Sequence, residues 1–243
     1  MIKVGKVSYL NTMPLFYKWD GSETVLVEGH PSELVDRLRK GEIKAGIVSS
    51  VEYLLHREDY LVVPNVCIAS KERACSVLIF SNKPLEDIKS LYLTPASLTS
   101  KELAIYVVNV IYGNSPELVK DRDKADALML IGDEAIIERS LGRWQYVYDL
   151  GEEWFKQHKL PFVFALFLVR KDAPTWLSDY IYFQCNRSKA LFIEDLTQGK
   201  IGVDGFSQDF LLEYFTSCLQ YDLSEEAMQS LRVFNSFLIK RGL

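Results

Sequence analysis

Residues 161–170 (PFVFALFLVR) form a nearly unbroken apolar run, and residues 74–81 (ACSVLIFS) form a second run of the same kind. Both are rich in Val, Ile, Leu and Phe, which favour buried strands. The segment between them has its own alternation of strand and helix patterns. The two runs therefore predict a pair of connecting strands, side by side as a hinge, between a first lobe and a second lobe inserted into it.

The rest of the chain alternates short strand patterns with helix patterns. Before residues 74–81, strands are predicted at residues 2–8, 24–27 and 44–48, and helices at 31–40 and from Ser49 onward. The inserted segment repeats this order, with strands at 91–93, 127–131 and 146–148 and helices at 99–112 and 133–141. Candidate helices follow at 175–196, 206–219 and 224–240. Such alternation predicts parallel sheets covered by helices.

The predicted fold class is α/β, with two α/β lobes joined by two hinge strands around a central cleft. Lobe one comprises residues 1–78 and 170–243, and lobe two comprises residues 79–169. In such folds, ligands bind where the carboxyl ends of strands and the N-termini of helices meet. One continuous sheet is the alternative arrangement for the same patterns.

Composition narrows the class of protein. The chain has 243 residues, of which 48% are hydrophobic and 25% charged, as in an ordinary globular protein. Its 28 basic and 33 acidic residues give a net charge of -5 without a basic cluster, so no nucleic-acid partner is expected. Residues 1–20 lack the apolar run of a signal peptide, and no apolar stretch is long enough to cross a membrane. We expect a cytoplasmic protein with a small-molecule substrate and no membrane partner.

Several kinds of chemistry lack their motifs in this chain. There is no GxGxxG after a strand, no Walker loop, no GxSxG and no HExxH. The four cysteines have no CxxC spacing, so we expect no metal site and no cofactor. The three histidines, His30, His56 and His158, occur in polar surroundings and are predicted to be surface residues.

The strongest candidate site residues follow the first predicted strand, in residues 8–15 (SYLNTMPL). Ser8, Tyr9 and Asn11 stand where a strand gives way to a helix, so they either cap that helix or point hydrogen-bonding groups into the cleft. The amide of Asn11 has no pKa near neutrality, so it cannot act as a general base. It can orient a hydroxyl or a carboxylate through hydrogen bonds.

The remaining candidates also lie at predicted strand ends and helix starts. Hydroxyl groups and the backbone N–H groups of a helix N-terminus suit a carboxylate ligand, although each hydroxyl could equally serve as a helix cap. Gly132 allows a close backbone approach, and Asp133 is either a cap or a polar contact. The candidate substrate-binding residues of this kind are Ser49, Ser50, Ser76, Ser97, Thr99, Ser100, Gly132 and Asp133.

Taken in order, these motifs resemble the chorismate dehydratase family of the futalosine route to menaquinone. The resemblance rests on residues 8–15, the Ser97, Thr99 and Ser100 element, and residues 130–133 (LIGD), 149–154 (DLGEEW) and 160–165 (LPFVFA). It implies a periplasmic-binding-protein-like fold of type II, and Asn11 matches the family's active-site Asn. The related dihydroxynaphthoate synthase family shares the fold but begins with a differently composed strand-end turn.

The chain departs from the family pattern at two places. Leu98 stands where the family usually has Arg, and Lys101 is the candidate that could replace that cation. His158 and Lys159 replace the small Thr-Gly pair that usually precedes LPFVFA.

The resemblance implies a hydro-lyase that removes water from chorismate to give 3-[(1-carboxyvinyl)oxy]benzoate, without a cofactor. In this interpretation Asn11 is catalytic and positions the leaving hydroxyl, while hydroxyl groups and helix N-termini hold the two carboxylates. Two alternatives stay open: a 1,4-dihydroxy-6-naphthoate synthase, and a non-catalytic protein that binds a small carboxylate on the same scaffold.

Overall fold

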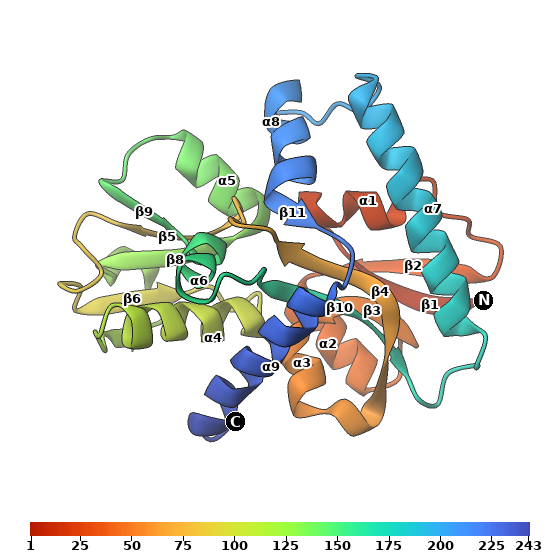
Figure 1. The fold of residues 1–243 in the computed structure, drawn as a ribbon, viewed down its shortest axis with the longest axis horizontal. Helices are drawn as coiled ribbons and strands as arrows, with labels where there is room; N and C mark the ends of the chain where they lie inside the picture. The colour runs from red at the N-terminus through yellow and green to blue at the C-terminus, as the bar shows by residue number, and fades with distance from the viewer. The chain divides into compact units, whose positions relative to one another are not determined.

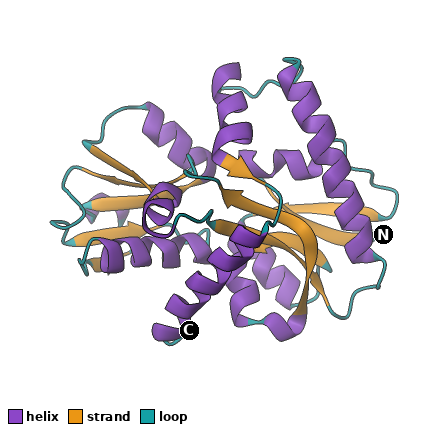
Figure 2. Ribbon diagram, viewed as in Figure 1, coloured by secondary structure: helices purple, strands orange, loops and turns teal.

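The computed structural model describes residues 1–243 and divides them into two compact units. Unit 1 consists of Met1–Ala69 and Val163–Glu225, and unit 2 of Ser70–Phe162 and Glu226–Leu243. Each unit is built on one β-sheet (Figures 1 and 2). No helix is both long and apolar enough to cross a membrane.

The sheet of unit 1 has the strand order β11-β4-β10-β3-β1-β2. Its strands are β1 (Ile2–Val7), β2 (Thr24–Gly29), β3 (Ala45–Ser49), β4 (Tyr60–Ser70), β10 (Val163–Arg170) and β11 (Leu219–Gln220). The pairs β1–β2 and β1–β3 are parallel, whereas β10 runs antiparallel to both β3 and β4. The carboxyl ends of β1 and β3 therefore lie at the same end of this sheet.

Five helices cover the sheet of unit 1. They are α1 (Met13–Phe16), α2 (Pro31–Arg39), α3 (Ser50–Leu55), α7 (Leu177–Thr197) and α8 (Gln208–Glu213), with short 3-10 turns at Leu10–Thr12 and Arg57–Asp59 and a π-helical turn at Tyr214–Cys218. In α2, Leu34 and Leu38 are one helical turn apart and both fully buried. A Cβ on Gly5 of β1 would come 2.8 Å from the side chain of Ile43 and 3.3 Å from that of Leu34. Glycine at that point lets α2 and the chain around Ile43 pack tightly on the sheet.

The sheet of unit 2 has the order β7-β6-β8-β5-β9. Its strands are β5 (Val77–Ser81), β6 (Ser90–Leu93), β7 (Glu117–Val119), β8 (Ala127–Ile131) and β9 (Tyr146–Asp149). The pairs β6–β7 and β6–β8 are parallel, and β5 runs antiparallel to β8 and β9. The two sheets thus share one plan: β10 or β5 runs antiparallel between three parallel strands on one side and a fourth strand of their direction, β4 or β9, on the other.

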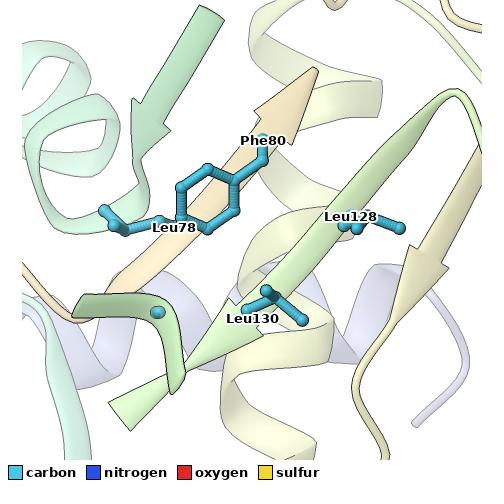
Figure 3. Close-up of a cluster of buried hydrophobic side chains, with 5 residues drawn as sticks. Leu78, Phe80, Leu128 and Leu130 are labelled. Atoms are coloured by element: carbon cyan, nitrogen blue, oxygen red, sulfur yellow. The ribbon is translucent and has the colours of Figure 1, made fainter. Parts of the chain in front are cut away.

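The helices of unit 2 are α4 (Leu98–Tyr106), α5 (Gly132–Ser140), α6 (Leu150–His158) and, after its first residue, α9 (Glu225–Lys240). A π-helical turn, Val107–Ile111, continues α4, and a 3-10 turn occupies Arg122–Lys124. Side chains alternate between the two faces of a strand, so Leu78 and Phe80 of β5 share a face with Leu128 and Leu130 of β8. Figure 3 shows these four residues together, and Ala135 of α5 completes the buried cluster.

A buried aromatic cluster holds α6 and α9 together in unit 2. The Trp154 ring of α6 lies 5.0 Å from that of Phe162 and 5.7 Å from that of Phe234 in α9, between ring centroids. Its indole N–H donates to the Ser230 hydroxyl of α9 at 2.9 Å. Both Trp154 and Phe234 are almost completely buried, so this cluster accounts for the assignment of the C-terminal helix to unit 2.

The unit boundaries differ from those expected from the sequence. The chain passes between the units at residues 69–70 and 162–163, whereas the boundaries expected at 78–79 and 169–170 fall within β5 and β10. The strands that run side by side at the crossings are β4 and β10, not β5 and β10, which belong to different sheets. Helix α9, expected in the first lobe, clusters with unit 2.

Among the elements that no sequence pattern predicted, β4 and α6 are the longest. Strand β4 contains Pro64 and Asn65, and Asn65 has a φ of 55°, a left-handed conformation that interrupts strand periodicity. The pairing of β4 with β10 is accordingly irregular. Helix α6 lies in a stretch for which no helix was predicted, and Asp149 caps its first turn by accepting from the N–H groups of Gly151 and Glu152 at 2.9 and 3.2 Å.

His158, expected at the surface, is half-buried at the end of α6. Its Nε2 lies 2.8 Å from the hydroxyl of Tyr106, and its ring centroid lies 4.1 Å from that of Trp154. The next residue, Lys159, has a φ of 55° and ends α6 in the left-handed region, where glycine would be unstrained.

The burial of His158 predicts a pH dependence of stability. Burial lowers the pKa of His158, so the unfolded chain binds the proton more readily than the folded chain. The contribution of His158 to the free energy of unfolding should be fully present above its unfolded-state pKa of about 6.5 and should decline as the pH falls below that value. Urea unfolding between about pH 7.5 and 5.5 measures this slope, and His158→Gln, which cannot titrate there, should make it shallower. An equal slope in both proteins would show that His158 is not responsible.

Candidate functional site

In unit 1 the candidate residues lie where two neighbouring parallel strands end. Strands β1 and β3 pair with Gly5 opposite Gly46, and a Cβ on Gly46 would come 3.3 Å from the Cα of Gly5. The two strands thus approach closely, and their carboxyl ends lead into residues 8–12 and into Ser49 and Ser50. The local fold brings Ser8, Tyr9, Asn11, Ser49 and Ser50 to one end of one sheet, as predicted for a ligand-binding edge.

The turn that carries Asn11 is held by its neighbours. The Thr12 hydroxyl lies 2.7 Å from the carbonyl oxygen of Val7 and 2.9 Å from that of Tyr9, and it donates its proton to one of these two oxygens. The Tyr221 hydroxyl donates to the backbone carbonyl of Asn11 at 2.9 Å. Burial also raises the pKa of Tyr221, which keeps that donor protonated. The backbone of Asn11 is therefore fixed from both sides.

The side-chain oxygen of Asn11, unlike its backbone carbonyl, has no hydrogen-bond donor. This atom, Oδ1, is buried. A buried acceptor without a donor costs about 1–3 kcal/mol, so proteins rarely keep one unless a ligand satisfies it. The amide oxygen of Asn11 is thus a preformed acceptor for a ligand hydroxyl or N–H group.

The hydroxyl groups next to Asn11 differ in what they can offer. Ser8 is exposed and Tyr9 is half-buried, with its ring centroid 6.2 Å from that of His30. Ser49 is buried at the N-cap position of α3, but its side chain does not cap that helix. Ser50 donates its hydroxyl proton to the carbonyl of Val163 at 2.8 Å, and so in this arrangement can only accept from a ligand.

In unit 2 the candidate residues also meet at one end of the sheet. Strand β8 ends at Ile131 opposite Val77, the first residue of its antiparallel partner β5. Gly132, just after β8, donates its N–H to the carbonyl of Ser76 at 2.7 Å. Just after β6, the N–H of Thr94 donates to the backbone carbonyl of Met129 at 3.2 Å, and the chain then continues into α4. Ser76, Gly132, Asp133 and the start of α4 therefore share this end.

The start of α4 shows which hydroxyl caps the helix. Ser97 Oγ accepts from the backbone N–H of Ser100 at 3.3 Å and lies 3.2 Å from the hydroxyl of Ser100. Thr99 is fully buried, and Lys101 is half-buried in the same first turn. Ser97 thus fills the ordinary role of an N-cap, which places its hydroxyl and that of Ser100 within the turn.

Helix α5 starts differently, because no side chain caps it. Its N-cap residue is Ile131, and Gly132 begins the helix with a φ of 62°. The N-terminus of a helix carries a partial positive charge and N–H groups that have no partner within the helix. Of the three helix starts at this end of unit 2, those of α4, α5 and α6, only that of α5 lacks a side-chain cap, so its N-terminus suits a carboxylate best.

A further residue at this end was missed as a site residue. Asp149 is buried and accepts hydrogen bonds from the backbone of residues 74 and 75 as well as from α6. An Asp followed by two glutamates, Glu152 and Glu153, is a helix-start pattern that could have revealed the cap. The contacts to residues 74 and 75 join segments far apart in the sequence, and no local pattern carries that information.

Comparison with solved structures identifies the fold. The crystal structure of protein AF1704 from Archaeoglobus fulgidus matches with a TM-score of 0.80 and 17% identity, covering 99% of this chain and 97% of that one. The alkanesulfonate-binding protein SsuA from Xanthomonas axonopodis pv. citri matches with a TM-score of 0.67 and 14% identity, covering 99% and 93%. The expected periplasmic-binding-protein-like fold, with two α/β units, is confirmed.

Sequence comparison identifies the family. The chain belongs to the menaquinone biosynthesis family, whose model matches residues 2–239. It is also similar to the chorismate dehydratase of Thermus thermophilus, with 28% identity over 195 residues that cover 70% of each chain.

Proposed function

We propose that this protein is a chorismate dehydratase that makes 3-[(1-carboxyvinyl)oxy]benzoate for menaquinone biosynthesis. The family match and the similarity to the Thermus thermophilus chorismate dehydratase support the pathway and the substrate. The observation from the structure that carries the proposal is the buried, unpartnered side-chain oxygen of Asn11 at the end of β1.

The reaction asks little of protein side chains. The C3–H and C4–O bonds of the chorismate ring break, water leaves, and the electron pair of the C3–H bond completes an aromatic ring. Aromatisation supplies the driving force, so positioning of the leaving group carries most of the catalytic task. A carboxylate of the substrate serves as the base in this proposal, and the proton leaves with the hydroxyl as water.

Asn11 is the catalytic residue in this proposal. The C4 hydroxyl of chorismate is a hydrogen-bond donor, and the Oδ1 atom of Asn11 is an acceptor that lacks one. Because an amide does not titrate near neutrality, Asn11 acts by orientation and not by proton transfer. Thr12 and Tyr221 hold the turn, so that the amide is in place before the substrate arrives.

The two carboxylates of chorismate need donors. In unit 2 we assign this role to the N–H groups at the start of α5, which no side chain caps, and to the first turn of α4 with Thr99 and Lys101. Lys101 is the cation in this set, in place of the Arg that Leu98 replaces. A chain with a net charge of -5 cannot attract a dianion by its overall charge, so such local donors must hold it.

Incubation of the purified protein with chorismate tests the proposal. We expect consumption of chorismate and the appearance of an aromatic product lighter by one water, followed by ultraviolet absorbance and mass spectrometry. Consumption of cyclic de-hypoxanthine futalosine instead would identify a 1,4-dihydroxy-6-naphthoate synthase. Absence of turnover with a saturable thermal shift by chorismate or another small carboxylate would identify a binding protein. We also propose a cytoplasmic location, which fractionation of the cells that make the protein tests.

A further inference from the structure

The buried carboxylate of Asp149 connects two segments of unit 2. Its Oδ1 atom accepts from the N–H groups of Gly151 and Glu152, which caps α6, and from that of Ala74 at 2.8 Å. Its Oδ2 atom accepts from the N–H of Cys75 at 2.7 Å. A helix cap needs only the first two bonds, so the other two hold the segment that leads into β5.

That segment has a conformation that needs support. Cys75 has a φ of 62°, in the left-handed region that costs a residue with a Cβ about 1 kcal/mol or more. The hydrogen bond from its N–H group to a carboxylate is of the strong, charge-assisted kind. Asp149 therefore stabilises the turn through which the chain enters β5.

Gly151 confirms how closely α6 and this segment approach. A Cβ on Gly151 would lie 2.8 Å from the backbone nitrogen of Ala74 and 2.9 Å from the hydroxyl of Ser70. The same Ser70 hydroxyl accepts from the N–H of Phe162 at 3.2 Å, just before β10. Within the motif Asp149-Leu150-Gly151, the carboxylate of Asp149 thus binds the N–H groups of residues 74 and 75. The absence of a side chain on Gly151 lets Ser70 and Ala74 pack directly against it.

The held segment continues into the candidate site. Ser76 follows Cys75 directly and is almost fully buried, and its backbone carbonyl accepts from the N–H of Gly132 at the start of α5, which no side chain caps. A shift of Cys75 would move the hydroxyl of Ser76 and the first N–H groups of α5 together. Asp149 is not itself one of the candidate ligand-binding residues. It contacts Cys75, and the next residue, Ser76, is one of them.

We infer that Asp149 is a positioning residue for the proposed reaction, which sets Ser76 and the start of α5 through its hydrogen bonds to Ala74 and Cys75. This inference rests on the proposed function for its kinetic meaning. Its structural content, that Asp149 holds residues 74–76, can be measured without any substrate.

A double-mutant cycle tests the kinetic part. In Asp149→Asn the side-chain oxygen can keep the cap of α6, but the amide nitrogen faces the N–H of Cys75 as donor against donor. Loss of that charge-assisted bond should lower kcat/KM for chorismate by about ten- to a hundredfold. Ser76→Ala removes the hydroxyl of Ser76 but keeps the backbone carbonyl that accepts from Gly132, so the same change in this background should cost measurably less than in the wild type but should not be free. Equal losses in both backgrounds would overturn the positioning of the Ser76 hydroxyl by Asp149.

Amide hydrogen exchange of residues 71–77 tests the structural part. We expect faster exchange at Ala74 and Cys75 in Asp149→Asn and in Gly151→Ala, which pushes on the same segment from the other side. Ser207→Ala removes the cap of α8 in unit 1, where Ser207 accepts from the N–H of Phe210, and should leave this exchange unchanged. Unchanged exchange in Asp149→Asn overturns the inference. If the wild-type protein does not turn over chorismate, the proposed function fails while the exchange result still decides this inference.

Discussion

Asn11→Ala is expected to abolish turnover of chorismate while leaving its binding within about tenfold. The Asn11 oxygen contacts the leaving hydroxyl in the proposed reaction, whereas helix N-termini and other hydroxyl groups hold the carboxylates that dominate binding. Loss of one preorganised hydrogen-bonding group at a reacting centre costs about a hundred- to a thousandfold in kcat. Single-turnover kinetics and isothermal titration with chorismate measure the two effects separately.

The same variant should change stability in an unusual direction. Removal of a buried acceptor that has no partner relieves its desolvation cost, so Asn11→Ala should be as stable as the wild type or more stable. Asn114→Ala is the matched control, because the Asn114 amide donates to the carbonyls of Leu85 and Ile88 at 2.7 and 2.8 Å. That control should lose stability and keep its kcat. Undiminished turnover in Asn11→Ala would remove Asn11 from the mechanism.

The fold could be predicted from the sequence wherever one pattern dominates a segment. The apolar runs at 161–170 and 74–81 correspond to β10 and β5, and the helix pattern at 31–40 corresponds to α2. Partner choice was not predictable, because it depends on contacts distant in the sequence. The pairing of β10 with β4 is an example, because Pro64 and Asn65 interrupt the strand pattern of β4 in the sequence.

The candidate site shows the same division. Its location follows from the rule that ligands bind at the carboxyl ends of parallel strands, and the structure places Asn11 in unit 1 and Gly132 in unit 2 at such ends. Which polar group already has a partner could not be predicted. Ser97 and Ser50 look equivalent in the sequence, yet one caps α4 and the other donates to Val163. Only coordinates reveal that Asn11 has an unmatched oxygen.

Trp154 illustrates a residue whose importance for stability exceeds its part in the proposed chemistry. Its ring is fully buried, touches aromatic rings of α9 and of the segment before β10, and donates to Ser230. The same helix also places the Phe237 ring 5.0 Å from that of Tyr106, between ring centroids, and buries Leu231 and Leu238. Undocking of α9 would expose the apolar face that carries Phe234 and Leu238.

Trp154→Ala is therefore expected to destabilise unit 2 by about 3–5 kcal/mol, the range for deleting a large buried aromatic side chain. Urea unfolding followed by circular dichroism measures the total, and amide exchange at Phe234 reports whether α9 is released first. Two controls separate the causes: Trp154→Phe keeps a ring without the N–H group, and Ser230→Ala leaves that N–H group without its acceptor, at a cost of about 1–3 kcal/mol. If Trp154→Ala costs no more than Ser230→Ala, the hydrogen bond and not ring packing holds the helix.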